Sequence, residues 1–130
     1  MKKVSILLVF FLALSGGNVM AADDTSDIGK ASEKARDLAL LTVAEIYLCR
    51  NAPPEDIGYA MMRAKRSIIR TYSSLAGKEY ASKVYEGMEY TVEQYYGDTA
   101  HSDVSDCSDN ISDKLREFEN AFAYMEYLSD

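Results

Sequence analysis

The chain has 130 residues, and its 21 acidic side chains outnumber 14 basic ones, which gives a formal net charge of −7 at pH 7. This negative charge repels nucleic acids and anionic lipid surfaces, so we exclude nucleic acids as partners. The length is typical of one small domain.

The first 22 residues have the three parts of a secretory signal peptide. Two lysines near the start precede an apolar run at residues 4–14, and Ala21 and Ala22 provide the small side chains that suit cleavage. The run is well short of the roughly 20 residues that a membrane-spanning helix needs. We therefore predict removal of residues 1–22, export to the periplasm or the medium, no membrane span after cleavage, and a single helical domain at residues 23–130.

The chain contains two cysteines, Cys49 and Cys107. An even number of cysteines in a small exported domain favours a disulfide. A redox pair or a set of metal ligands is the alternative, but the sequence has neither C-x-x-C spacing nor a cysteine–histidine cluster. We predict a Cys49–Cys107 disulfide.

The first helix is expected from about Asp27 to Arg50. Its second half, residues 38–49 (LALLTVAEIYLC), is apolar on nearly every side, as is typical of a buried helix. Glu45 is the only carboxylate in that half. We expect it to lie at the edge of the fold or to pair with an arginine of the next helix.

Three further segments carry apolar side chains at steps of three and four residues, the spacing of one helix face. Pro54 suits the first position of the second helix, and Gly77 and Gly97 suit the ends of the second and third. Ser108 or Asp109 is expected to be the N-cap of the fourth. The expected apolar faces, in chain order, are Ile57, Met61, Ala64, Ile68, Tyr72 and Leu75; then Ala81, Val84, Met88, Val92 and Tyr95; then Ile111, Leu115, Phe118, Phe122 and Met125.

No segment alternates with a period of two residues for long enough to predict a strand. The sequence thus predicts an all-α fold, a small disulfide-stapled bundle of about four helices, up-and-down or a close variant. In that arrangement the end of the first helix and the start of the fourth lie at the same end of the bundle, so the predicted disulfide fits it.

Residues 97–113 form an acidic linker that contains His101, the only histidine. A calcium-binding EF-hand loop needs a central glycine and a closing glutamate, and neither is in place. A single histidine without a partner does not define a metal or haem site. We expect no metal and no cofactor. We also expect no enzymatic activity, because no serine or cysteine nucleophile comes with a placed base.

Arg63, Arg66 and Arg70 fall opposite the apolar face of the second helix in an otherwise acidic chain. They form one of two kinds of surface. The first is an ordinary solvated face, whose positive charge is balanced by the acidic segment within the fold. The second is a docking face for a protein partner, since segregated charge steers association. Tyr90 points away from the apolar face of the third helix. Exposed tyrosines are typical of protein-binding surfaces, so Tyr90 joins the three arginines as a candidate binding residue.

Other tyrosines of the third helix, Tyr85, Tyr95 and Tyr96, project near its apolar face, and we expect them to pack at the edge of the core. The chain has ten tyrosines and no tryptophan. This composition modestly favours an interaction function.

One cysteine lies late in the first helix (residues 46–49, IYLC), and the other opens the last helix (residues 106–108, DCS). With the signal peptide and the mature size, this layout resembles the amidase immunity proteins of type VI secretion systems. Those are small helical periplasmic proteins that block a toxic peptidoglycan amidase. The resemblance lies in the architecture of the whole mature chain and carries over no site residue. It implies a protein-binding module whose partner is another exported protein.

Two other classes stay open. The chain is similar to the small acid-stress chaperones of the enterobacterial periplasm, which are also acidic, helical and held by one disulfide. Those are shorter, and the tryptophan near their first cysteine has no counterpart here. An accessory protein of the envelope or of secretion is the third class, and a homodimer is compatible with each of them.

We expect mass spectrometry of the exported protein to place its N-terminus at Ala22 or Asp23. The intact mass should be lower than that of the reduced chain by the pair of hydrogens lost in the disulfide. Free thiols on the purified native protein would contradict the disulfide, and an intact Met1 would contradict the signal peptide.

Overall fold

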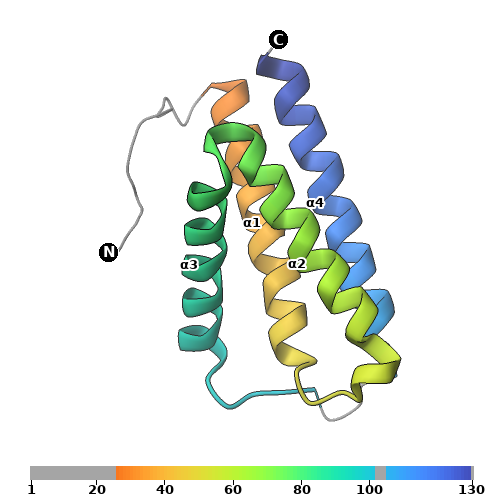
Figure 1. The fold of residues 1–130 in the computed structure, drawn as a ribbon. Coiled ribbons are helices and arrows are strands. Elements are labelled where there is room, and N and C mark those ends of the chain that lie inside the picture. Colours follow the sequence, from red (N-terminus) through yellow and green to blue (C-terminus); the bar gives the residue numbers. More distant parts are fainter. Residues whose placement is uncertain (1–25, 102–104, 130) are drawn as a thin grey trace.

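The computed structural model of the protein describes residues 26–101 and 105–129, and the predicted signal peptide lies outside them. Within these ranges the chain is all-α and contains no strand, which confirms the predicted fold class. Its four helices are α1 (Asp27–Leu48), α2 (Pro54–Ala76), α3 (Lys78–Tyr96) and α4 (Cys107–Ser129) (Figure 1).

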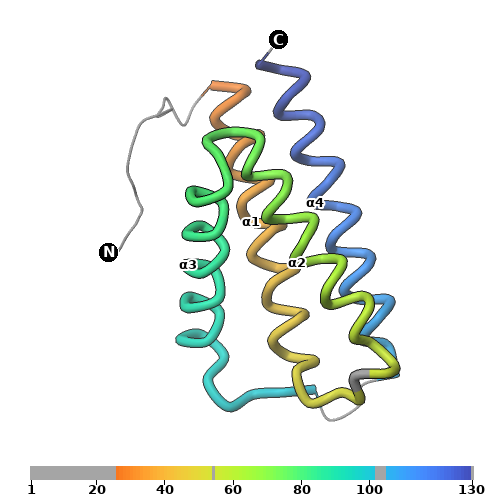
Figure 2. Tube along the Cα trace, viewed as in Figure 1, coloured from red at the N-terminus to blue at the C-terminus, as the bar shows by residue number. Residues whose placement is uncertain are grey.

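Successive helices run in opposite directions (Figure 1). α1 packs mainly against α4, and α2 mainly against α3, while the parallel pairs α1–α3 and α2–α4 make smaller interfaces. α1 and α2 therefore lie diagonally opposite each other in the bundle, and so do α3 and α4. The connection from α3 to α4 has to cross the end of the bundle, and residues 97–101 run toward the end of α1 (Figure 2).

The predicted disulfide is present. Cys49 directly follows α1 and Cys107 opens α4; their Cα atoms are 6.0 Å apart and both residues are buried. The two cysteines are separated by 58 residues in the sequence. Closing a loop of that length is worth about 4 kcal/mol in the chain-entropy estimate.

Local signals set most helix boundaries. The Ser26 hydroxyl accepts a hydrogen bond from the Gly29 N–H at 3.0 Å and caps α1. Gly77 has a φ of +95°, a conformation that favours glycine, and this single residue ends α2 and precedes α3. α1 ends at Leu48, slightly before the predicted Arg50, because the Arg50 N–H bonds in a turn to the carbonyl of Tyr47.

The predicted cap of the last helix is wrong. α4 begins at Cys107, so Ser108 and Asp109 lie inside its first turn. The Ser108 hydroxyl donates instead to the carbonyl oxygen of Asp56 at 3.2 Å and ties the first turn of α4 to the first turn of α2. The Asn110 N–H donates to the carbonyl oxygen of Asp106 at 2.9 Å, so the helical hydrogen bonds of α4 begin directly before Cys107.

The core combines small side chains on α1 with large ones on α4. Ala35, Ala39 and Val43 are buried on α1, and small side chains let its backbone approach a neighbouring helix closely. Phe118 and Phe122 of α4 are buried in the same core cluster. The Phe118 ring stacks on Tyr72 of α2 with centroids 5.9 Å apart, which joins the two halves of the bundle.

Two residues of the predicted apolar faces are not in the core. Leu75 is 51% exposed and Tyr95 is 81% exposed. Each lies in the last turn of its helix, where the helical spacing continues but neighbouring helices no longer cover the face. Tyr85, expected at the edge of the core, is fully buried, and this burial raises the pKa of its phenol. Tyr96 is half-buried.

None of the helices in the described ranges has both the length and the apolar character needed to cross a membrane.

Phe118→Ala should lower the free energy of unfolding by about 3–5 kcal/mol, because it removes a fully buried ring and leaves a cavity between α2 and α4. Chemical denaturation followed by circular dichroism measures this. Leu75→Ala is the matched control and should cost less than about 0.5 kcal/mol, since the Leu75 side chain is largely exposed. Equal costs for the two variants would contradict the placement of the core.

Candidate functional site

The candidate docking residues of α2 lie together on the surface. Arg63, Arg66 and Arg70, which we call the arginine face, are all exposed. They line a shallow groove between α2 and α4, and Glu119 lies on the α4 side of it. The groove residues are Tyr59, Met62, Arg63, Arg66, Ser67, Arg70 and Glu119.

The arginine face lies near one carboxylate, Glu119, but forms no ion pair within the described residues. Over residues 26–101 and 105–129, none of the three guanidinium groups makes an ion pair or a hydrogen bond. Glu119, the carboxylate of the groove, instead accepts a hydrogen bond from the Ser67 hydroxyl at 2.8 Å. The acidic segment forms no ion pair with these arginines within the described residues, so an ordinary solvated face and a docking face both remain as interpretations. The surface therefore keeps three positive charges on an acidic protein.

Apolar and aromatic side chains lie beside these charges. Tyr59 is 75% exposed and Met62 is 50% exposed, both within the groove. A second hollow between α2 and α4 shares Glu119 and continues along the pair to Phe122 and Glu126. We call the two hollows together the α2–α4 groove.

Some tyrosines lie apart from the groove. Tyr90 is 65% exposed, as predicted, but it is on α3 and does not line the groove. Tyr124 and Tyr127, near the end of α4, are also exposed, and their rings stack with centroids 6.4 Å apart. The structure thus brings together three of the four candidate binding residues.

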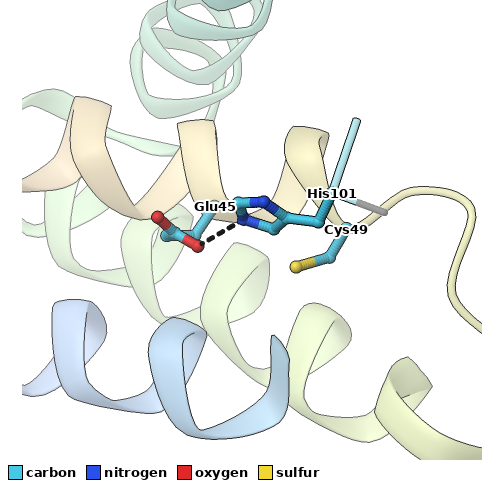
Figure 3. A group of neighbouring side chains, drawn as sticks. All are labelled: Glu45, Cys49 and His101. Atoms are coloured by element: carbon cyan, nitrogen blue, oxygen red, sulfur yellow. Dashed lines mark hydrogen bonds and ion pairs between the residues drawn. The ribbon is translucent and has the colours of Figure 1, made fainter. Parts of the chain in front are cut away.

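A second constellation forms at the end of α1, and it was not found in the sequence. Glu45 does not pair with an arginine of α2. Its Oε1 lies 3.3 Å from Nε2 of His101, and Cys49 lies one helical turn further along α1 (Figure 3). We call Glu45, Cys49 and His101 the end cluster. One ligand-type atom from each lies within 4.8 Å of the others.

The sequence shows no cysteine–histidine cluster, but the fold brings Cys49 and His101 together. Glu45 and Cys49 are four residues apart, a spacing that places both on one face of a helix and is visible in the sequence. His101 is distant in the sequence and reaches them because the α3–α4 linker passes the end of α1. Only the path of that linker could reveal the cluster.

Several contacts fasten this linker to α1. The Arg50 guanidinium donates to the carbonyl oxygens of Tyr47 and Thr99, at 2.8 and 2.7 Å, and lies over the Tyr47 ring. The Tyr47 hydroxyl donates to the carbonyl of Gly97. The His101 N–H donates to the carbonyl of Leu48 at 2.9 Å and extends the end of α1.

Comparisons of the chain with protein-family models, with curated proteins and with solved structures gave no significant match.

Arg50→Ala should release the linker from the end of α1. The charged hydrogen bond to the Thr99 carbonyl at 2.7 Å and the longer one to the Gly97 carbonyl at 3.5 Å are lost, so hydrogen exchange at the His101 amide should accelerate by about tenfold or more. Hydrogen–deuterium exchange read out by mass spectrometry measures this. Arg36→Ala is the control, because Arg36 pairs only with exposed Glu33 and Asp37, and it should leave the exchange unchanged.

Proposed function

We propose that the protein is a periplasmic or secreted binding module that docks another exported protein on the arginine face and the α2–α4 groove. The observation that carries this proposal is a set of three exposed arginines, next to exposed Tyr59 and Met62, that form no ion pair with any described residue. Arginine, tyrosine and methionine are the residue types that protein interfaces favour, whereas solvated faces more often carry lysine and glutamate.

The chemistry of the groove defines the kind of partner. An acidic surface with a protruding apolar side chain would satisfy the guanidinium groups and cover Tyr59 and Met62. Guanidinium groups form paired hydrogen bonds to carboxylates, so such contacts would add orientation as well as attraction. The acidic remainder of the chain would repel a second acidic body everywhere else, which favours one docking orientation.

Within this class, an immunity-type inhibitor of a cell-wall-degrading toxin is the most specific proposal. The predicted signal peptide supports it, because such a toxin acts in the periplasm. The positions of Cys49 at the end of the first helix and Cys107 at the start of the last also support it. Inhibition would consist of covering the toxin's active site with the bundle surface, which requires no catalytic group on this chain.

The double variant Arg66→Glu/Arg70→Glu should fold normally, since exposed substitutions change stability by less than about 0.5 kcal/mol. Its association with the partner should slow by roughly tenfold or more at low salt, and the salt dependence should weaken, because the steering charge is reversed. The measurement is recovery from periplasmic extract, identification of the partner by mass spectrometry, and binding kinetics with the purified partner.

The control for that experiment is Lys78→Glu/Lys83→Glu, which makes the same change in net charge on α3. It should alter association much less, because neither lysine lines the α2–α4 groove. Equal recovery of the same partner by wild type and by the arginine double variant would contradict the docking face. Equal loss in both double variants would show that net charge alone matters.

A further inference from the structure

Three side chains of metal-binding type meet where α1 ends, and a fourth, at the start of α4, is bonded to one of them. Three form the end cluster, in which Glu45, Cys49 and His101 place one ligand-type atom each within 4.8 Å of the others (Figure 3). The fourth is Cys107, whose Sγ is bonded to the Sγ of Cys49. In the disulfide both sulfurs lack the thiolate charge that a metal needs, so the cluster offers only its carboxylate and imidazole.

Reduction changes this donor set. Two thiolates, one imidazole and one carboxylate are four ligands of the types that bind zinc, and zinc sites with four protein ligands are tetrahedral. We propose that the protein in its reduced form binds one zinc ion through Cys49, Cys107, His101 and Glu45. The disulfide and the zinc ion are then alternative ways of joining the end of α1 to the start of α4.

The separations within the end cluster suit such a site. Bonds of roughly 2.0–2.2 Å from zinc to nitrogen and oxygen place these two ligand atoms about 3.4 Å apart on a tetrahedron. His101 Nε2 and Glu45 Oε1 are 3.3 Å apart. Two thiolates on the same ion lie about 3.8 Å apart, so once the disulfide is broken, rotation of the cysteine side chains opens the required space.

The surroundings supply an entry path and a fixed scaffold. Cys49 and Cys107 are buried, whereas the His101 and Glu45 side chains are 34% and 21% exposed, so an ion can reach the sulfurs from their side. Glu45 and Cys49 share one face of α1, and the Arg50 contacts hold the linker that carries His101. Three of the ligands are therefore positioned before any metal arrives, which reduces the entropy lost on binding.

The exchange balances with a dithiol as reductant. A dithiol transfers two electrons to the Cys49–Cys107 bond and becomes a cyclic disulfide, leaving two thiols on the protein. Zinc displaces their two protons and binds the two thiolates. In the reverse direction a disulfide oxidant takes two electrons from the two thiolates and two protons from water, which re-forms the Cys49–Cys107 bond and releases the ion.

The probe is zinc itself, added to the purified protein in its oxidised form and after reduction by a dithiol that is then removed without air. Competition with a chromophoric chelator measures affinity and stoichiometry. The reduced protein should bind one ion per chain, at least about tenfold more tightly than the oxidised protein. Cobalt in place of zinc should give thiolate charge-transfer absorption and the strong visible bands of a tetrahedral ion, only after reduction.

Two variants distinguish a folded four-ligand site from zinc binding by the two cysteines of an unfolded chain. Glu45→Gln and His101→Asn should each weaken zinc binding to the reduced protein by on the order of tenfold or more, since even outer residues of metal sites matter this much. Glu33→Gln, an exposed position on the same helix, should have no effect. If Glu45→Gln and His101→Asn bind zinc as tightly as the wild type does, the proposal fails, because unchanged affinity would show that these two side chains are not zinc ligands.

If reduction partly unfolds the bundle, circular dichroism measures whether zinc restores the helices. Zinc should then restore the helical signal of the reduced wild type and not that of reduced His101→Asn, since metal binding and folding are coupled. Equal zinc affinity of the oxidised and reduced proteins would overturn the proposal. A reduced, unfolded chain that zinc leaves unfolded would overturn it as well. The site shares no residue with the α2–α4 groove, so these outcomes do not depend on docking.

Discussion

The Cys49–Cys107 disulfide joins the end of α1 to the start of α4, and these two helices form the most extensive interface of the bundle. The inner face of α1 is built largely from alanines, each of which buries little apolar area. A stabilisation of about 4 kcal/mol from loop closure is a large fraction of the roughly 5–15 kcal/mol that a small domain has in total. The alanine face can pack closely because the covalent link keeps its partner helix in place.

The arrangement of the helices has a second consequence at the same end of the molecule. Because α3 and α4 lie on a diagonal, their linker crosses the end of the bundle and meets α1. Arg50 and Tyr47 hold it there through hydrogen bonds to backbone carbonyls. This path brings His101 to Glu45 and Cys49, so a requirement of the topology produces a group of side chains with metal-binding chemistry.

The arginine face depends on solvent exposure and unpaired charge and not on the disulfide. α2 contacts α3 and α4, and Arg63, Arg66 and Arg70 line the groove between α2 and α4, where they stay exposed to solvent. Glu119, the carboxylate that lines the same hollow as the three arginines, accepts a hydrogen bond from Ser67 and forms no ion pair with them. An arginine face without an ion pair to any described residue, beside exposed Tyr59 and Met62, supports docking.

The sequence by itself determined the helices, because a 3.6-residue spacing of apolar side chains, a proline at the start of α2 and glycines at the ends of α2 and α3 are local signals. It determined the Cys49–Cys107 pair as well, since the chain offers no other choice, and it located the arginine face by helical spacing. Only the tertiary structure decided which helices are neighbours, that the last turns at Leu75 and Tyr95 are uncovered, and that His101 meets Glu45. These depend on contacts between residues far apart in the chain, and helical periodicity carries no information about which distant segment covers a given face.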